Sequence, residues 1–241
     1  MQANQVNIAK LTIVPTPIGN LKDITFRAIE ALKSCDRVIA EDTRNTGKLL
    51  LHFGIHKPMF SFFAGNEQKV LEKVLSFIGN GENLVLVSDS GTPGISDPGF
   101  ILVRECIKNQ IPVQCLPGPT AFVPALILSG FPLHSFVFEG FLPQKKGRLN
   151  KLMSLKNETR TMVFYESPYR IKKMLAEIKE IFGVTRLVSV SREISKIYEE
   201  TIRGTADELL NHFEKIEPRG EFVVVISGNP NPIFQHSIIP Y

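Results

Sequence analysis

The sequence has little of what marks secreted, membrane-bound or disulfide-linked proteins. Only three cysteines, Cys35, Cys106 and Cys115, occur in 241 residues, and none forms a C-x-x-C pair. Each lies beside apolar neighbours, so we expect buried thiols in a reducing compartment. No apolar run approaches the ~20 residues of a membrane helix, and residues 1–10 lack the apolar core of a secretion signal. We therefore expect a cytoplasmic protein without a membrane partner.

Nucleotide-binding fingerprints and metal ligand sets are also missing. The glycine-rich segments match neither the phosphate loop G-x-x-x-x-G-K-[ST] nor G-x-G-x-x-G, which argues against a dinucleotide cofactor. His52 and His56 have i, i+4 spacing, but Gly54 interrupts them and no cysteine or carboxylate cluster completes a set. No metal is expected. The net charge of +4 permits a polyanionic partner without requiring one.

The most informative segment is a long loop at residues 88–99, Ser-Asp-Ser-Gly-Thr-Pro-Gly-Ile-Ser-Asp-Pro-Gly. It follows the apolar run 84–87, which predicts a buried strand, and precedes the helical pattern 100–107. Most such connections take about 2–6 residues. Glycines let the backbone approach a ligand, and ligands bind at the carboxyl ends of strands in open α/β sheets. The loop indicates a binding site more than a structural connection.

Apolar patterning predicts an α/β fold in two domains. In the first half, strands at 11–14, 37–40, 59–63, 83–87 and 113–116 alternate with helices near 25–32, 48–52, 67–78, 100–107 and 121–128. This alternation favours a sheet with helices on both faces. The glycine and proline cluster at 129–134 suits a link between a domain of residues 1–130 and one of residues 135–241.

The second half predicts a mixed sheet, because two strands lie close together across residues 194–199. This half resumes with the segment 135–141. Strands are expected near 161–165, 186–191, 198–203 and 221–227, and helices near 148–155, 169–182 and 206–215. Thr205 and Glu208 have the spacing of a capping box.

Four loops would gather at one edge of the first sheet: residues 15–20, 41–46, 88–99 and 117–121. They suit a ligand held by backbone N–H and C=O groups with little fixed charge. Thr120 at the start of a helix is equally consistent with a helix N-cap.

Several of these segments together resemble one enzyme family. Residues 12–21 (Thr-Ile-Val-Pro-Thr-Pro-Ile-Gly-Asn-Leu), 40–44 (Ala-Glu-Asp-Thr-Arg), the 88–99 loop and 116–121 (Leu-Pro-Gly-Pro-Thr-Ala) are similar to the tetrapyrrole methylase superfamily. More narrowly, they resemble its ribosomal RNA branch, the small-subunit rRNA (cytidine-2′-O-)-methyltransferases. Residues 164–170, 191–194 and 219–223 agree, and the likeness covers nearly everything from Leu11 to Ser227.

The resemblance implies two α/β domains that bind S-adenosylmethionine in a cleft between them, usually in a homodimer. The implied substrate is the ribose 2′-oxygen of a cytidine in the decoding region of 16S rRNA, within the small ribosomal subunit. The implied cofactor contacts are Pro17, Ile18, Ser90, Gly91, Thr92, Ile95, Thr120, Ala121, Tyr165 and the region of Arg192 and Glu193. Members tend to have His-Asn-Glu where this chain has Gly65-Asn66-Glu67.

A ribose hydroxyl is a weak nucleophile until it is deprotonated, which calls for a base or for nearby cations. The polar residues near the expected cleft are Glu41, Asp42, Arg44, Glu166, Arg192 and Glu193. We favour Glu166, Arg44 and Asp42 as catalytic residues. Structural ion pairs are an equal alternative for each of them.

The densest basic stretch, Lys145, Lys146 and Arg148, enters a predicted helix and suits contacts with RNA phosphates. A solvated surface run is the alternative. Two other functions remain open: a methylase of the same fold that acts on a small molecule or a protein side chain, and a non-catalytic module that binds the cofactor.

Overall fold

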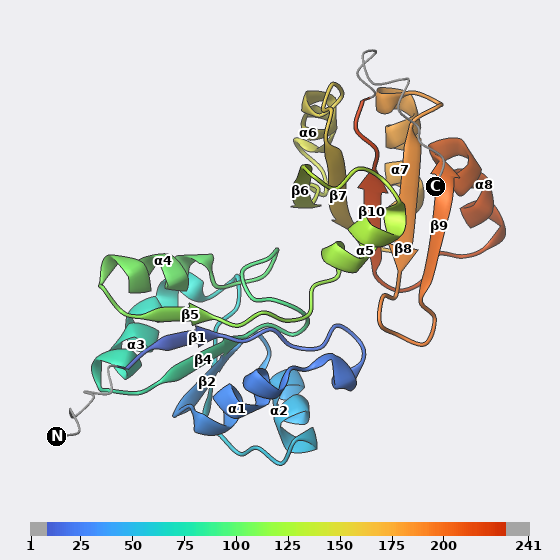
Figure 1. Ribbon diagram of the computed structural model, residues 1–241. Coiled ribbons are helices and arrows are strands. Elements are labelled where there is room, and N and C mark those ends of the chain that lie inside the picture. The colour runs from blue at the N-terminus through green and yellow to red at the C-terminus, as the bar shows by residue number, and fades with distance from the viewer. Residues whose placement is uncertain (1–8, 230–241) are drawn as a thin grey trace. The chain divides into compact units, whose positions relative to one another are not determined.

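The computed structural model describes residues 9–229, so residues 1–8 and 230–241 of the two expected domains lie outside it. The chain divides into two compact units, the first ending at Thr120 and the second beginning at Ala121 (Figure 1). This division precedes the link expected at residues 129–134. Helix α5 (Phe122–Ser129) lies after the division because it packs against strands of the second unit.

The first unit is a five-stranded parallel sheet with strand order β3-β2-β4-β1-β5. Its strands are β1 (Leu11–Ile13), β2 (Arg37–Ala40), β3 (Met59–Ser61), β4 (Leu84–Val87) and β5 (Val113–Cys115). Its helices are α1 (Phe26–Ser34), α2 (Thr43–His52), α3 (Glu67–Gly79) and α4 (Phe100–Lys108), with a 3-10 turn at Leu21–Asp23.

Helices cover both faces of this sheet, as predicted (Figure 1). Successive residues of a strand point to opposite faces. Val85 and Val87 accordingly pack in one layer with α1 and α2, and Leu84 and Leu86 in the other with α3 and α4. Strand β4 is thus buried on both faces.

The second unit contains a mixed sheet with strand order β6-β7-β10-β8-β9, also as predicted. Its strands are β6 (Phe136–Phe141), β7 (Thr161–Glu166), β8 (Leu187–Arg192), β9 (Glu200–Thr205) and β10 (Phe222–Ile226). The β6–β7 pair is parallel, and the other neighbouring pairs are antiparallel. The remaining helices are α6 (Arg148–Ser154), α7 (Ile171–Phe182) and α8 (Ala206–Lys215).

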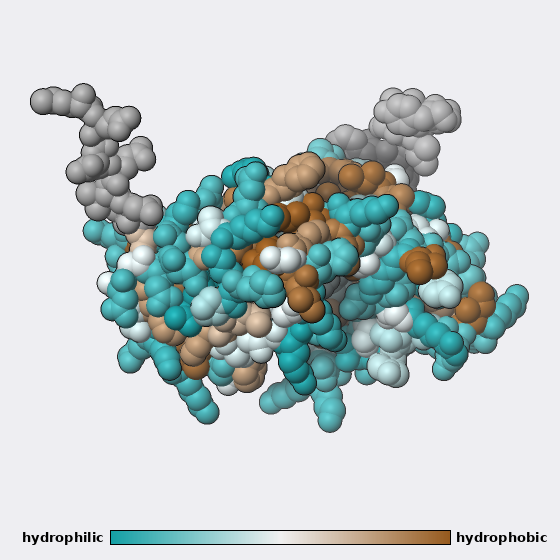
Figure 2. Space-filling model, turned by 90° about the horizontal axis from the view of Figure 1, so that it is seen from below, coloured by the Kyte–Doolittle hydropathy of each residue, from teal (hydrophilic) through white to brown (hydrophobic). Residues whose placement is uncertain are grey.

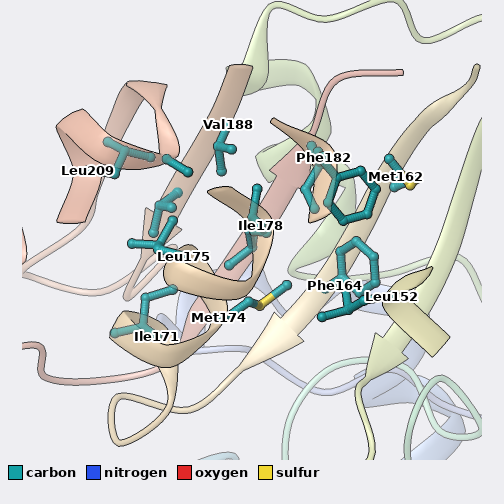
Figure 3. Packing of buried hydrophobic residues seen from close by; sticks show 14 of the residues in the cluster. Leu152, Met162, Phe164, Ile171, Met174, Leu175, Ile178, Phe182, Val188 and Leu209 are labelled. Atoms are coloured by element: carbon teal, nitrogen blue, oxygen red, sulfur yellow. The ribbon is translucent and has the colours of Figure 1, made fainter. Parts of the chain in front are cut away.

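The core of the second unit lies between this sheet and helices α6, α7 and α8 (Figure 3). Helix α7 buries Ile171, Met174, Leu175 and Ile178, whose spacing of three and four residues makes one apolar face. The predicted capping box of Thr205 and Glu208 is present at the start of α8.

The surface is mainly polar on the face drawn in Figure 2, with smaller apolar patches. Across residues 9–229, every helix is too short or too polar to cross a bilayer. Cys35 and Cys106 are buried, but Cys115 is exposed. The expectation of three buried thiols is therefore wrong for Cys115, because it lies on the edge strand β5.

Candidate functional site

The loops that follow β1 and β4 are joined by main-chain hydrogen bonds. Thr16 N–H donates to the carbonyl oxygen of Gly91 at 2.8 Å, and Gly91 N–H donates to that of Thr16 at 3.0 Å. The Thr16 hydroxyl also donates to the Ser88 carbonyl oxygen at 3.1 Å. The carboxyl ends of β1 and β4, neighbours in the sheet, therefore present one fixed backbone surface.

The loop after β5 joins the same cluster. The Thr92 hydroxyl donates to the Pro119 carbonyl oxygen at 3.0 Å. A Cβ atom on Gly118 would lie 2.6 Å from Pro15 Cβ, so this close approach requires glycine. Gly91 has φ of +80°, and a Cβ there would touch Ile18 at 3.4 Å. The structure thus brings together Ile18, Gly91 and Thr92, three of the residues that the resemblance implied as cofactor contacts.

The rest of the 88–99 loop leaves room for a ligand beside this cluster. Ser90 is exposed, and a Cβ on Gly94 would meet nothing within 4 Å. The far end of the loop is fixed by Glu67, whose Oε1 accepts from Gly99 N–H at 3.0 Å. Fixed main-chain groups next to open space suit a ligand that is held through backbone N–H and C=O groups.

A cavity of about 320 Å³ opens beside the Thr16–Gly91 bridge. It is bounded by the loop after β1, helix α2 and the end of β4. Its lining residues are Thr16, Pro17, Leu21, Asn45, Thr46, Lys48, Leu49, His52, Ser88 and Asp89. The predicted cofactor residue Pro17 therefore lies on a wall of this cavity.

Two carboxylates tie the loop after β2 to the loop after β4. Glu41 Oε2 accepts from Asp89 N–H at 3.2 Å, and Asp89 Oδ1 accepts from Asp42 N–H at 3.2 Å. The other oxygen of Asp89 accepts from Asn45 Nδ2 at 3.0 Å. Burial raises the pKa of Glu41, against the effect of the Asp89 N–H bond. Glu41 and Asp89 thus fix the loop that carries Ser90, Gly91 and Thr92.

Asp97 lies in the same loop, and sequence reasoning missed it as a candidate. Burial, followed by repulsion from Glu41, raises the pKa of Asp97 to about 7, although a hydrogen bond with Ser88 opposes the shift. A carboxyl group with such a pKa exchanges a proton near neutral pH. The signal available in the sequence was an aspartate in a glycine-rich loop.

Asp42 and Arg44, predicted as catalytic, form an ion pair with each other. Arg44 Nη2 lies 2.6 Å from Asp42 Oδ2, and the Arg44 side chain is 86% exposed. Asp42 is also the N-cap of α2, where it accepts from Arg44 N–H at 2.8 Å. The hydrogen bonds from Arg44 lower the pKa of Asp42 to about 2, so Asp42 is a poor proton acceptor.

Glu166, also predicted as catalytic, is buried in an ion-pair network of the second unit. Its Oε2 accepts from Arg148 Nη2 at 2.9 Å, and its Oε1 accepts from Arg170 Nε at 2.9 Å and from Ser167 N–H at 2.8 Å. Arg148 Nε donates to Glu177 at 2.8 Å. Both oxygens of Glu166 are engaged, so its contacts fit the structural ion pair that was the alternative.

The same network requires a correction for Arg148. Only 2% of its side chain is exposed, so it does not lie on the surface with Lys145 and Lys146, which are exposed. The prediction that Arg148 contacts RNA phosphates is therefore wrong. Arg148 instead begins α6 and turns inward, because Glu166 and Glu177 supply buried partners for its guanidinium.

The other predicted cofactor residues of the second unit contact their neighbours within it. The Tyr165 ring lies 5.3 Å from Phe138 and 5.4 Å from Phe141. Burial alone would raise the pKa of Glu193, but bonds from Lys196 and from Glu221 N–H lower it.

The remaining predicted positions lie at loop ends. Ile95 is half-buried in the 88–99 loop, and Thr120 closes the first unit. Ala121 rather than Thr120 is the N-cap of α5. Within residues 9–229 no group of three or more His, Cys, Asp or Glu side chains is arranged to hold a metal ion.

Comparisons with known sequences agree on one family. The family described as Tetrapyrrole (Corrin/Porphyrin) Methylases matches residues 10–210. A Thermotoga maritima protein named Ribosomal RNA small subunit methyltransferase I is 48% identical over 221 residues, covering 92% of this chain and 99% of its own length. A protein of the same name from Escherichia coli O157:H7 is 47% identical, covering 91% of this chain and 78% of its own length.

Solved structures share the fold at much lower identity. The methyltransferase CobJ has a TM-score of 0.68 at 18% identity, covering 91% of this chain and 94% of its own. The uroporphyrin-III C-methyl transferase of Thermus thermophilus, solved with S-adenosyl homocysteine, has a TM-score of 0.64 at 17% identity, covering 91% and 97%. At these identities the likeness establishes the α/β fold alone.

Proposed function

We propose, because this chain belongs to the tetrapyrrole methylase family, that it is an S-adenosylmethionine-dependent methyltransferase acting on small-subunit ribosomal RNA. The observation that carries this proposal is the 48% identity, over 92% of the chain, with a relative of that name. The acceptor within the proposal is the ribose 2′-oxygen of a cytidine in the decoding region of 16S rRNA. The reaction takes place in the cytoplasm, where ribosomal subunits are made, and the enzyme acts as a homodimer.

The first unit fits the cofactor. The joined loops after β1, β4 and β5 offer main-chain donors and acceptors and small side chains, next to open space at Ser90 and Gly94. Ile18, Gly91 and Thr92 would hold the cofactor, together with Pro17, Ser90, Ile95 and Thr120 and, from the second unit, Ala121, Tyr165 and Glu193. S-adenosylmethionine supplies an activated methyl group on a sulfonium.

The chain's own residues must align the acceptor oxygen behind that methyl carbon and remove its proton. Alignment alone can supply much of the rate. Among the first-unit carboxylates described above, Asp97 suits proton transfer, since its pKa of about 7 lies near the working pH. Glu166 is less suitable, because both its oxygens accept bonds from arginines or a backbone N–H.

RNA would be held partly through Lys145 and Lys146, which are exposed on the loop before α6. A small-molecule or protein-side-chain substrate is supported by the shared fold alone. The relatives at 47–48% identity, in contrast, are named as ribosomal RNA methyltransferases. Ribosomal RNA is therefore the preferred substrate.

The test is a map of ribose methylation on small-subunit rRNA from cells with and without this protein, followed by restoration with the purified protein and S-adenosylmethionine. A single 2′-O-methyl cytidine that disappears and returns is expected. An unchanged map, with methyl transfer to a tetrapyrrole instead, would overturn the RNA assignment.

A further inference from the structure

The buried ion pairs of the second unit join two segments that are far apart in sequence. Arg148, at the start of α6, bonds Glu166 at the end of β7 and Glu177 on α7, with distances of 2.9 and 2.8 Å. Glu166 in turn bonds Arg170, just before α7. The basic loop before α6 and the first turn of α7 are therefore anchored to one buried framework.

Exposed cations extend from both segments of this framework. Lys145 and Lys146 are exposed on the loop, and Lys172 and Lys173 are exposed on the first turn of α7. Lys173 lies 3.8 Å from Glu177, and its side chain is still 60% exposed. The carboxylates that bond Arg148, Glu166 and Glu177, are largely buried. The surface presented to solvent is thus positive, which complements a phosphate backbone.

A tyrosine ring lies beside the same turn. Tyr169 is 95% exposed, although aromatic rings usually bury most of their surface. An open ring next to cations is the combination by which proteins hold unpaired nucleotides, whose bases stack on aromatic side chains.

We infer that Tyr169, Lys172 and Lys173 form one single-strand RNA-binding surface with Lys145 and Lys146. The buried ion pair of Arg148 and Glu166 holds the segments that carry these residues. This inference rests on the proposed function, which makes RNA the partner. The exposed residues contact the RNA. Arg148 and Glu166 are positioning residues, because their buried groups cannot reach a phosphate.

Binding is measured with the full chain on a single-stranded oligoribonucleotide, on an RNA duplex of equal length and on small subunits from cells lacking the protein. Tyr169→Ala is expected to weaken single-strand binding about tenfold and Tyr169→Phe to restore it, because stacking needs the ring. Duplex binding should change little. Equal single-strand affinity of Tyr169→Ala and wild type would overturn the stacking role.

The lysines are tested as a pair. Lys172→Ala with Lys173→Ala should lower the slope of log affinity against log salt by about one for each phosphate that the variant no longer neutralises. Lys156→Ala with Lys179→Ala is the control, since it also removes two positive charges, one just after α6 and one in the last turn of α7, where Lys179 pairs with Asp207. Equal slopes for the two double variants would contradict this surface.

Arg148→Lys tests the framework. It keeps the charge but loses the fork that reaches two carboxylates, so RNA affinity should fall although every residue that touches RNA is unchanged. If this variant does not fold, the Tyr169 variants and the Lys172→Ala, Lys173→Ala double variant still test whether the surface binds RNA.

The inference and the proposed function fail in different ways. S-adenosylmethionine affinity, measured by calorimetry, should be unchanged in Tyr169→Ala. Normal methylation of subunits by all the exposed-residue variants would refute this surface and leave the proposed function intact. A wild-type chain that methylates no rRNA would refute that function instead.

Discussion

The two units build their candidate sites from different interactions. In the first unit, loops after β1, β4 and β5 are held by main-chain and hydroxyl hydrogen bonds, such as those between Thr16 and Gly91. In the second, charged side chains around Arg148 and Glu166 hold the end of β7 against α6 and α7. The first arrangement suits a cofactor with little need for salt-sensitive contacts. The second holds segments that carry the exposed Lys145, Lys146, Lys172 and Lys173. RNA binding should therefore depend strongly on salt, while cofactor binding should not.

The largest effect is expected from breaking the buried pair. Arg148→Met leaves Glu166 buried with less compensation, and loss of one partner of a buried pair costs about 3–5 kcal/mol. Arg44→Met breaks an exposed pair of the first unit, which water screens, so this variant should lose far less stability. Urea unfolding of both variants measures the contrast. Equal losses in the free energy of unfolding would show that the buried pair stabilises the fold no more than the exposed pair does.

The next effect concerns the backbone of the cofactor loop. Gly91→Ala and Gly94→Ala both place a side chain at positive φ, which costs about 1–2 kcal/mol at each position. Gly91 also pairs with Thr16 and adjoins Ile18, whereas Gly94 faces open space. Gly91→Ala should therefore lose more affinity for S-adenosylmethionine than Gly94→Ala, as measured by calorimetry. The reverse order would place the cofactor elsewhere on the loop.

Asp97 is also expected to make the stability of the chain depend on pH. The folded chain keeps the proton on Asp97 up to its raised pKa of about 7, whereas the unfolded chain releases it near 3.8. The free energy of unfolding should therefore fall as pH rises between these values, because the folded state binds more protons.

Asp97→Asn should lack that part of the pH dependence, and its methyl transfer should be slow at every pH if Asp97 takes the proton. Parallel pH curves of stability for the variant and the wild type would show that the Asp97 pKa is not raised. Unchanged turnover would exclude Asp97 as the base.

Much of the fold could be predicted from apolar patterning. A buried strand such as 84–87 is an unbroken apolar run, and an amphipathic helix such as α7 has apolar residues at a spacing of three and four. The capping box of Thr205 and Glu208 could also be predicted, because it depends only on residues three positions apart. Helix α2 begins at Thr43, five residues earlier than predicted, because the Asp42 cap stabilises a turn of modest helix formers.

What the sequence did not disclose depends on contacts between distant residues. The basic neighbours of Arg148 predict an exposed side chain, but its partner Glu166 lies 18 positions away. Asp97 gains its raised pKa from burial and from Glu41, on a different strand end. The Thr16–Gly91 bridge likewise joins segments more than seventy residues apart in order to make the proposed cofactor seat. No local pattern specifies such pairings.

The central claim is that the joined loops of the first unit seat the cofactor. Titration calorimetry of S-adenosylmethionine into the full wild-type chain and into Thr92→Arg tests it directly, with circular dichroism showing that both are folded. Thr92 donates to Pro119 beside Gly91, so an arginine there should fill the seat and abolish binding. Binding of equal affinity by the two proteins would contradict the account.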